Sequence, residues 1–315
     1  MKKASDLLKI RDSIIYNSNV KSDIKLIGLG DLHLSNLVGQ KDVDLVLKSI
    51  DEEKPNYICF LGDLIDSPLL LTNDKKLKEL ESLIKNSAEI APTFIVLGSH
   101  DFIDESTDNF SDILSLMDIW DYLDSISNVN VLNDKFYSNE EIFIAGYRQK
   151  RDVYYNLMNE HVEDANAYYN DVIKYTSLYT CLPMEKPKIF LTHSPEPLHN
   201  KNNINLLSGY DVIMAGHYHN GCVPALLDNI MPGNMGLITS RKKLFPSKAR
   251  GIDRLQSGTY LIYSGGWVKI QECAPTLLHP LDDLCNRQMD VVTLTSDEEI
   301  KEIKTSDKRK VLKIR

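Results

Sequence analysis

Short apolar runs rich in isoleucine, valine and phenylalanine recur along the first two thirds of the chain, and a glycine or histidine directly follows each one. Runs of this length and composition are typical of buried strands. Between the first three runs, aliphatic residues recur at helical spacing over 43–50 and 77–84, and a proline follows each helical segment. We therefore predict a βαβαβ unit. The predicted strands are 24–29, 57–61, 94–97, 189–192 and 212–215.

The rest of the pattern predicts one large domain with an insertion. The stretch 102–187 mixes helical and strand patterns, so we expect a partly helical insertion or cap there. Two later strand-like runs, 259–263 and 291–295, indicate a second sheet. The expected fold class is α/β, a four-layer α/β/β/α sandwich of two mixed β-sheets flanked by helices. We expect a single domain over 1–315, with a basic tail from about residue 300.

Composition and charge narrow the class of protein. A chain of 315 residues that is 43% hydrophobic and 26% charged is typical of a globular protein. Its net charge of -9 disfavours a nucleic-acid partner, because binding several phosphates requires a matching set of lysines and arginines. Five cysteines without paired spacing indicate free thiols in a reducing compartment. Residues 1–24 contain neither a signal-peptide pattern nor a spanning helix, so we expect a cytoplasmic protein.

Aspartate and histidine are concentrated directly after the five predicted strands. In open α/β sheets, side chains at the carboxyl ends of neighbouring strands face one crevice, so these segments are expected to converge. Carboxylate and imidazole ligands together suit Mn, Fe, Zn or Co better than Ca, which prefers oxygen ligands. Two such ions that share one carboxylate can turn a bridging water into a hydroxide nucleophile near neutral pH. The segments are Asp31-Leu32-His33, Gly62-Asp63-Leu64-Ile65-Asp66, Gly98-Ser99-His100-Asp101, His193 and Gly216-His217-Tyr218-His219.

In this order the segments resemble the motif series of the calcineurin-like metallophosphoesterases: D-x-H, G-D-x-x-D, G-N-H-D/E, H and G-H-x-H. The match covers 31–219. The region up to about residue 295 is similar to the bacterial branch that includes membrane-associated phosphodiesterases and lipid-precursor pyrophosphatases. The resemblance implies two divalent metal ions, with manganese as the first choice and Fe, Zn or Co as alternatives.

The resemblance also assigns ligands to the first metal ion. Asp31, His33 and His219 would bind this ion, and Asp63 would bridge it to the second ion. One carboxylate that can bridge, with a few terminal ligands on each side, is what a two-metal site requires.

At the second ion, His193 and His217 would be joined by the residue at the asparagine position of the third motif, which in this chain is Ser99. A hydroxymethyl group is shorter than an asparagine side chain, so we expect a water to fill the gap between Ser99 and the ion. The second site is therefore expected to be the weaker one. Three protein ligands can still hold a metal ion.

Two further side chains are expected to assist the chemistry. His100 resembles the family histidine that lies beside the metals and stabilises the phosphoryl oxygens or protonates the departing oxygen, and Asp66 would hold its imidazole. Arg148 follows the strand-like run 142–145, so its guanidinium is a candidate contact for the substrate phosphate. Asp101 is interpreted as a support for the loop or for the water network.

A basic cluster interrupts the acidic chain and surrounds the sequence Leu-Phe-Pro at 244–246. It is either a solvated loop or a positive rim that attracts an anionic substrate or contacts an anionic membrane. The lysine-rich end of the chain allows the same two interpretations. The cluster consists of Arg241, Lys242, Lys243, Lys248, Arg250 and Arg254.

Taken together, these features predict a metal-dependent hydrolase of phosphate esters that acts by a metal-bridging hydroxide. The expected substrate is a phosphodiester or pyrophosphate in a small or lipid-linked molecule. Two alternatives stay open, namely a nuclease of the same fold and a scaffold protein with weakened catalysis. The acidic net charge argues against the nuclease, whereas Ser99 argues for the scaffold.

Overall fold

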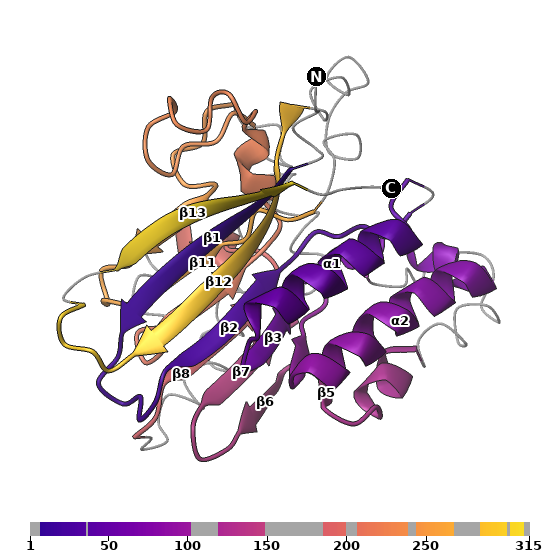
Figure 1. Cartoon of the computed structure of the whole chain (residues 1–315), viewed down its shortest axis with the longest axis horizontal. Helices are drawn as coiled ribbons and strands as arrows, with labels where there is room; N and C mark the ends of the chain where they lie inside the picture. The colour runs from indigo at the N-terminus through magenta and orange to yellow at the C-terminus, as the bar shows by residue number, and fades with distance from the viewer. Residues whose placement is uncertain are drawn as a thin grey trace, which may run out of the picture.

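The structure is a computed structural model, in which two mixed β-sheets pack face to face (Figure 1). It describes residues 7–35, 37–101, 119–148, 185–199, 207–238, 244–267, 284–300 and 303–311.

The first sheet has seven strands in the order β13-β1-β12-β2-β3-β4-β5. Its strands β2 to β5 run parallel to one another, β12 runs antiparallel to β2, and the edge strand β13 is antiparallel to β1. Their bounds are β1 Leu7–Tyr16, β2 Ile24–Leu29, β3 Tyr57–Phe60, β4 Thr93–Ile95, β5 Val129–Val131, β12 Arg287–Thr295 and β13 Lys304–Val311.

The second sheet has six strands in the order β10-β11-β9-β8-β7-β6. The four inner strands are parallel, and the two edge strands are antiparallel to their neighbours. Their bounds are β6 Lys135–Ser138, β7 Phe143–Tyr147, β8 Lys188–Thr192, β9 Val212–Ala215, β10 Gly251–Arg254 and β11 Tyr260–Tyr263. The described short 3₁₀ segments are η2 Pro68–Thr72, η3 Glu196–His199 and η5 His219–Cys222.

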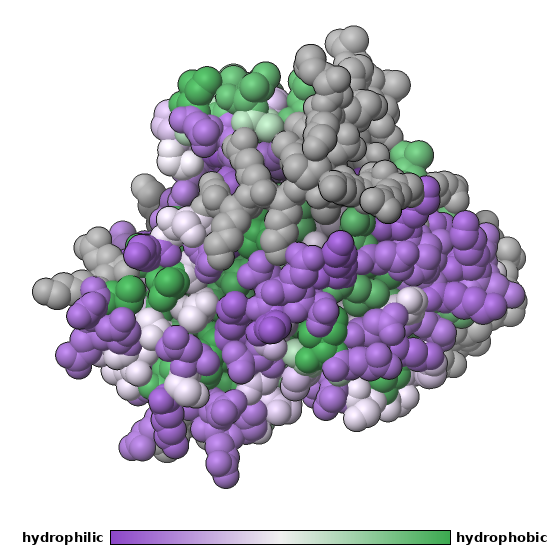
Figure 2. Space-filling view, viewed as in Figure 1, coloured by the Kyte–Doolittle hydropathy of each residue, from purple (hydrophilic) through white to green (hydrophobic). Residues whose placement is uncertain are grey.

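Two helices, α1 Gln40–Glu53 and α2 Asp74–Ile90, lie side by side on the outer face of the first sheet (Figure 1). Their apolar residues recur at helical spacing and are buried in one core with the sheet, while their outer surface is hydrophilic (Figure 2). Helix α1 ends where Lys54 adopts a left-handed backbone before Pro55, and α2 begins at Asn73, whose side chain accepts the Lys75 N–H.

A second apolar core fills the space between the two sheets. Leu26, Cys59 and Phe94 from the first sheet lie in the same buried cluster as Leu191 and Met214 from the second. Because both faces of these central strands are covered, their sequences are nearly continuous apolar runs. The two cores fix the carboxyl ends of strands from both sheets at one edge of the sandwich.

The predicted βαβαβ unit and the α/β class with two mixed sheets flanked by helices are confirmed. Most of the predicted insertion, 102–118 and 149–184, lies outside the described residues. Part of the segment expected as a basic tail forms β13, because its backbone pairs with β1. Strand β1 itself was not predicted. None of the helices in the described ranges is long and apolar enough to cross a bilayer.

Candidate metal centre

The five predicted segments converge where β2, β3 and β4 of one sheet and β8 and β9 of the other reach their carboxyl ends. The first two loops run side by side. The backbone N–H of Asp31 donates to the carbonyl of Gly62 at 2.9 Å, and that of His33 donates to the carbonyl of Asp63 at 2.9 Å. These ladder bonds extend the parallel pairing of β2 and β3 into the site, so the sheet register determines which side chains meet.

The backbone at the site is held in an uncommon conformation. Positive φ angles are rare for residues other than glycine, and each costs about 1–3 kcal/mol. Such strain persists only where the surrounding structure enforces it, and it is concentrated at functional sites. Five of the predicted ligands have φ between 46° and 72°, namely Asp31, His33, Asp63, His217 and His219.

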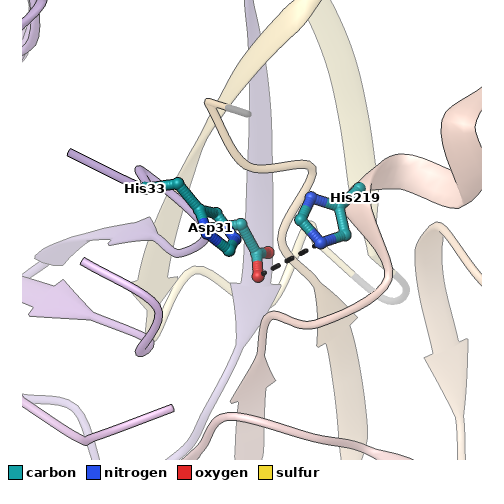
Figure 3. A group of neighbouring side chains, drawn as sticks. All are labelled: Asp31, His33 and His219. Carbon is teal, nitrogen blue, oxygen red and sulfur yellow. Dashed lines mark ion pairs between the residues drawn. The ribbon is translucent and has the colours of Figure 1, made fainter. Parts of the chain in front are cut away.

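The first ligand group consists of Asp31, His33 and His219, which are all buried. One ligand atom from each residue lies within 4.8 Å of the others. The rings of His33 and His219 stack with centroids 5.4 Å apart, and His219 Nε2 lies 3.9 Å from Asp31 Oδ1. Figure 3 shows the three side chains turned toward one another, with His219 approaching on the loop that follows β9.

The second ligand group consists of Asp63, His193 and His217, again with ligand atoms within 4.8 Å of one another. His193 Nε2 lies 3.0 Å from Asp63 Oδ2. The other ring nitrogen, Nδ1, is 2.8 Å from the carbonyl of Leu61, so it carries the proton and donates. This hydrogen bond fixes the ring orientation and directs Nε2 into the group, as is typical of metal-binding histidines.

Asp63 connects the two groups. Its Oδ2 lies 3.0 Å from His193 Nε2 in the second group and 3.7 Å from His33 Nε2 in the first. Gly62 permits this approach, because its φ is +85° and a Cβ there would lie 2.7 Å from His193 Nδ1. The position of Asp63 is the one that a bridging carboxylate requires.

The electrostatics of the site favour cations. Burial and the negative charge of Asp63 raise the pKa of Asp31 to about 7, although His193 opposes this shift. Burial also disfavours protonated His193, but the charge and hydrogen bond of Asp63 outweigh it and raise the pKa of His193 to about 9. Burial lowers the pKa of His33 and of His219, which keeps these two imidazoles neutral and able to bind metal.

The donor set fits a pair of divalent metal ions. In the described part of the chain, the ion-pair contacts of Asp31 and Asp63 are with histidines, not with lysine or arginine. Buried carboxylates require nearby positive charge, and imidazoles that face them, unlike lysine or arginine, can share these carboxylates with metal ions. Mixed imidazole and carboxylate ligands suit Mn, Fe, Zn or Co.

Asp101 has a supporting role in the geometry. Its buried carboxylate accepts the backbone N–H groups of Asp63 at 2.7 Å and Gly98 at 2.8 Å through Oδ2, and those of Leu64 and Ile65 through Oδ1. It therefore joins the second and third loops. Burial and the charge of Asp63 raise the pKa of Asp101 to about 7, although the backbone donors oppose the shift.

A sixth loop, 264–267, was missed in the sequence. It follows β11 and lies against the first ligand group, with the N–H of Trp267 donating to the carbonyl of Asp31 at 3.2 Å. Gly266 has a φ of +72°, and a Cβ on it would lie 2.8 Å from that of Asp31. The available signal was the Gly-Gly pair that follows a strand-like run, as in the other motifs.

Comparison with known proteins agrees with this geometry. The calcineurin-like phosphoesterase family matches residues 24–221. The chain belongs to this family.

Among relatives of this family, the chain is 25% identical over 203 residues to an uncharacterized metallophosphoesterase of Campylobacter jejuni, which covers 64% of this chain and 46% of the relative. It is also 25% identical over 210 residues to a transmembrane protein with metallophosphoesterase domain from Bos taurus, covering 64% of this chain and 41% of that protein. The chain thus spans less than half the length of these two relatives.

One of the similar solved structures is a dimetal phosphatase from Danio rerio, which is 12% identical. The match covers 78% of this chain and 88% of the other, with a TM-score of 0.42.

At the asparagine position of the calcineurin-like family, Ser99 is half-buried, and its Oγ lies 3.3 Å from Asp63 Oδ2. The neighbouring His100 is exposed at the rim of the site. Its backbone N–H donates to Asp63 Oδ1 at 2.8 Å, and its Nδ1 donates to the carbonyl of Asp66 at 2.8 Å. The Asp66 carboxylate is farther away, with Oδ1 3.7 Å from His100 Nδ1 and 3.6 Å from His33 Nδ1.

Arg148 is exposed at the end of β7, directly after Tyr147. Tyr147 pairs with Thr192 in β8. Arg148 and His193 are therefore the next residues on two neighbouring strands. Its N–H donates to Asp134 Oδ1 at 3.1 Å.

The predicted basic rim needs a correction at Arg250. This guanidinium is buried, because Asp228 and the carbonyls of Met231 and Met235 take its donors. Lys248 pairs with Asp253 at 2.6 Å, and Arg254 lies over the ring of Tyr260. Residues 241–243 lie outside the described ranges.

Proposed function

We propose that the chain hydrolyses a phosphodiester or pyrophosphate in a small or lipid-linked molecule, with a pair of divalent metal ions, manganese being the first choice. The observation that supports this proposal is the sharing of Asp63 between two Asp/His groups. Asp31, His33 and His219 would hold one ion and His193 and His217 the other.

When bound, such a pair of ions supplies charge neutralisation for the phosphoryl oxygens and lowers the pKa of a water molecule. The residues of the chain determine how the ester is oriented. Their buried positions exclude water from the back of the site, so the ester enters from the side where His100 is exposed.

His100 acts as the proton donor to the departing oxygen in this proposal. Its Nδ1–H is held by the Asp66 carbonyl, which leaves Nε2 available for the substrate. Burial of part of the ring disfavours the protonated form, but the charges of Asp63 and Asp66 and the hydrogen bond to the Asp66 carbonyl together raise the pKa of His100 above its ordinary value. A shift in this direction favours the protonated imidazole, which is the form that a general acid requires.

Arg148 is proposed to contact a non-reacting phosphate oxygen. It follows β7, whose neighbour β8 ends at His193, and adjacent strands lie about 4.8 Å apart. A guanidinium presents a planar pair of donors to an oxyanion. A pyrophosphate or diester with a second anionic group would benefit most from this contact.

Ser99 favours one alternative, a catalytically weakened scaffold. A side chain shorter than asparagine reduces the ligand set of the second ion to Asp63, His193 and His217. Weak occupancy of that site would limit turnover at low metal concentration.

The decisive experiment combines elemental analysis with a substrate panel. The purified chain is loaded with manganese and assayed on bis-p-nitrophenyl phosphate, p-nitrophenyl phosphate, nucleotide sugars and a single-stranded oligonucleotide. We expect two metal ions per chain and release from the diester that disappears with chelator and in Asp63→Ala. Absence of metal-dependent release, even in Ser99→Asn, would favour the scaffold, and cleavage of the oligonucleotide alone would favour a nuclease.

A further inference from the structure

The backbone of Asp31 is held at both of its polar groups. Its N–H donates to the carbonyl of Gly62 at 2.9 Å, and its carbonyl accepts the N–H of Trp267 at 3.2 Å. Asp31 has a φ of 52°, a conformation that persists only where the surrounding structure enforces it. The sixth loop, through Trp267, therefore supplies one of the hydrogen bonds that hold this strained residue in place.

The side chain of Trp267 is anchored by an ion pair. The indole is fully buried, and its Nε1–H donates to Asp42 Oδ1 at 3.1 Å. The Arg287 guanidinium pairs with the same Asp42 oxygen at 2.5 Å and lies over the indole, 4.9 Å from the ring centroid. We call the three side chains of Asp42, Trp267 and Arg287 the tryptophan clamp. Each of them contacts the other two, so the orientation of the indole is fixed.

The clamp connects the sixth loop to a helix and a strand. Asp42 lies in the first turn of α1, and Arg287 is the first residue of β12. The residue after Arg287, Gln288, donates its N–H to the carbonyl of Gly266 at 2.9 Å. The carbonyl of Asp31 is thus positioned by two regular elements, one of which lies more than two hundred residues away along the chain.

The contacts of the clamp favour the first ligand group. Within the described ranges, the hydrogen bonds of Trp267 lead to Asp31 and to Asp42. The second ligand group has a support of its own, because the carboxylate of Asp101 accepts the N–H of Asp63 at 2.7 Å. Loss of the clamp is therefore expected to disturb the first metal site more than the second.

The ion pair of the clamp is nearly removed from water. The side chain of Asp42 is 13% exposed and that of Arg287 is 8% exposed. Desolvation of two such charges can cost as much as their attraction returns, so a buried ion pair by itself is weak evidence for stability. Its geometry is better suited to fix the arrangement of neighbouring groups, which here are Trp267 and, through its N–H, Asp31.

We propose that the tryptophan clamp is a positioning device for the first metal ion, because it holds the backbone of Asp31 so that the carboxylate keeps the geometry of a ligand. Groups that support metal ligands determine metal affinity, and their removal costs about 10- to 100-fold. The inference rests on the proposed function for the presence of two metal ions, but it is independent of which ester is hydrolysed.

The test is a double-mutant cycle in which each metal site is measured by itself. In the full chain, His193→Ala removes a ligand of the second ion and leaves the first site, whereas Asp31→Asn does the converse. Trp267→Phe keeps a buried aromatic ring but removes the Nε1 donor. In titration calorimetry, we expect Trp267→Phe to weaken manganese binding about tenfold in the His193→Ala chain and less than about twofold in the Asp31→Asn chain.

Tyr57→Phe is the matched control. Tyr57 is also buried, and its hydroxyl donates to Glu141 at 3.1 Å, but it begins β3, at the end of the strand away from the metal centre. We expect this control to leave manganese binding unchanged in both backgrounds. Asp42→Asn is a second variant of the clamp that removes the charge facing Arg287 and keeps the side-chain volume, and we expect a smaller weakening, again confined to the first site.

The outcomes separate the clamp from the proposed function. Unchanged binding in the His193→Ala chain, or equal weakening in the two backgrounds, would overturn the positioning role, since a residue that only stabilises the fold affects neither site or both. If Trp267→Phe does not fold, Asp42→Asn is judged by the same two criteria. Absence of manganese binding in the unmodified chain would contradict the proposed function and the role of the clamp together.

Discussion

The metal centre and a cluster of ion pairs, both buried in the described part of the chain, differ in which groups accompany their carboxylates. In the metal centre, the carboxylates of Asp31 and Asp63 face histidines. In the ion-pair cluster, which we define as Lys9, Arg11, Asp228, Arg250 and Asp290, each carboxylate faces a lysine or arginine, at 2.8 Å for Lys9–Asp228 and 2.6 Å for Arg11–Asp290.

The backbone differs in the same way. Arg11 and Asp290 are register partners on β1 and β12, in regular strand conformation. Asp31 and Asp63 lie on loops with left-handed φ of 52° and 51°. Asp290, which has a cation from the chain, is thus built into the sheet, whereas Asp31 and Asp63, which are surrounded by imidazoles, are held in strained loops, where metal ions would supply the charge.

The largest expected effect is loss of turnover in Asp31→Asn, by about a thousandfold or more, because this variant removes a proposed ligand of the first ion. Since the folded pKa of Asp31 is raised from 3.8 to about 7, its ionisation costs stability in the metal-free fold as pH rises through this window. Above pH 7 the metal-free variant should be at least as stable as the unmodified chain. Steady-state kinetics measures the loss of turnover, and urea unfolding with a chelator measures the stability. Strong destabilisation of Asp31→Asn above pH 7 would contradict the difference between the metal centre and the ion-pair cluster.

Arg11→Met should have the opposite profile. It leaves Asp290 buried with its charge uncompensated, which costs about 3–5 kcal/mol of the free energy of unfolding. Turnover per folded molecule should remain near that of the unmodified chain. The control is Lys135→Met, which breaks an exposed pair with Asp124 and should cost less than about 1 kcal/mol. Equal losses in the two variants, measured by urea unfolding, would contradict this interpretation.

His100→Ala sharpens the comparison within the metal centre, because His100 is exposed while most ligands are buried. We expect a fall of about a hundredfold on a diester with an alkyl leaving group, which needs protonation, and a smaller fall with p-nitrophenolate, which does not. Metal content should stay the same. An equal fall on both substrates, in steady-state kinetics, would exclude the proton-donor role.

Ser99→Asn carries the smallest expected effect. An amide oxygen at this position should tighten binding of the second manganese ion by about tenfold, because it adds a ligand beside Asp63. Titration calorimetry measures the change, and Ser99→Ala serves as the control that adds no ligand. Unchanged affinity and stoichiometry in Ser99→Asn would show that Ser99 does not limit the second site.

Much of the site was predictable because each ligand directly follows an apolar strand. Asp31 follows β2 and Asp63 follows β3, and the parallel pairing of these two strands brings their loops to one edge. His193 follows β8 in the other sheet, so the packing of the two sheets brings it to the same edge. The loop 264–267 was missed because its contacts to Asp31 are made by backbone and glycine, which carry no chemical signature in the sequence.

Strand β1 shows what local pattern could not reveal. Its inner face carries Lys9 and Arg11, and two charged residues on one face normally indicate that this face is exposed. Only their ion-pair partners explain why the face is buried. Those partners, Asp228 and Asp290, lie more than two hundred residues away along the chain.

The sequence by itself determined which segments form buried strands and which types of ligand follow them, because apolar runs and short-range spacing are local properties. Only the tertiary structure decided that Asp63 lies between two histidine groups, that Arg250 is buried, and that Leu226, Ile230 and Phe245 are exposed. These facts depend on long-range packing and on the pairing of buried charges, which bring together residues that no local pattern connects.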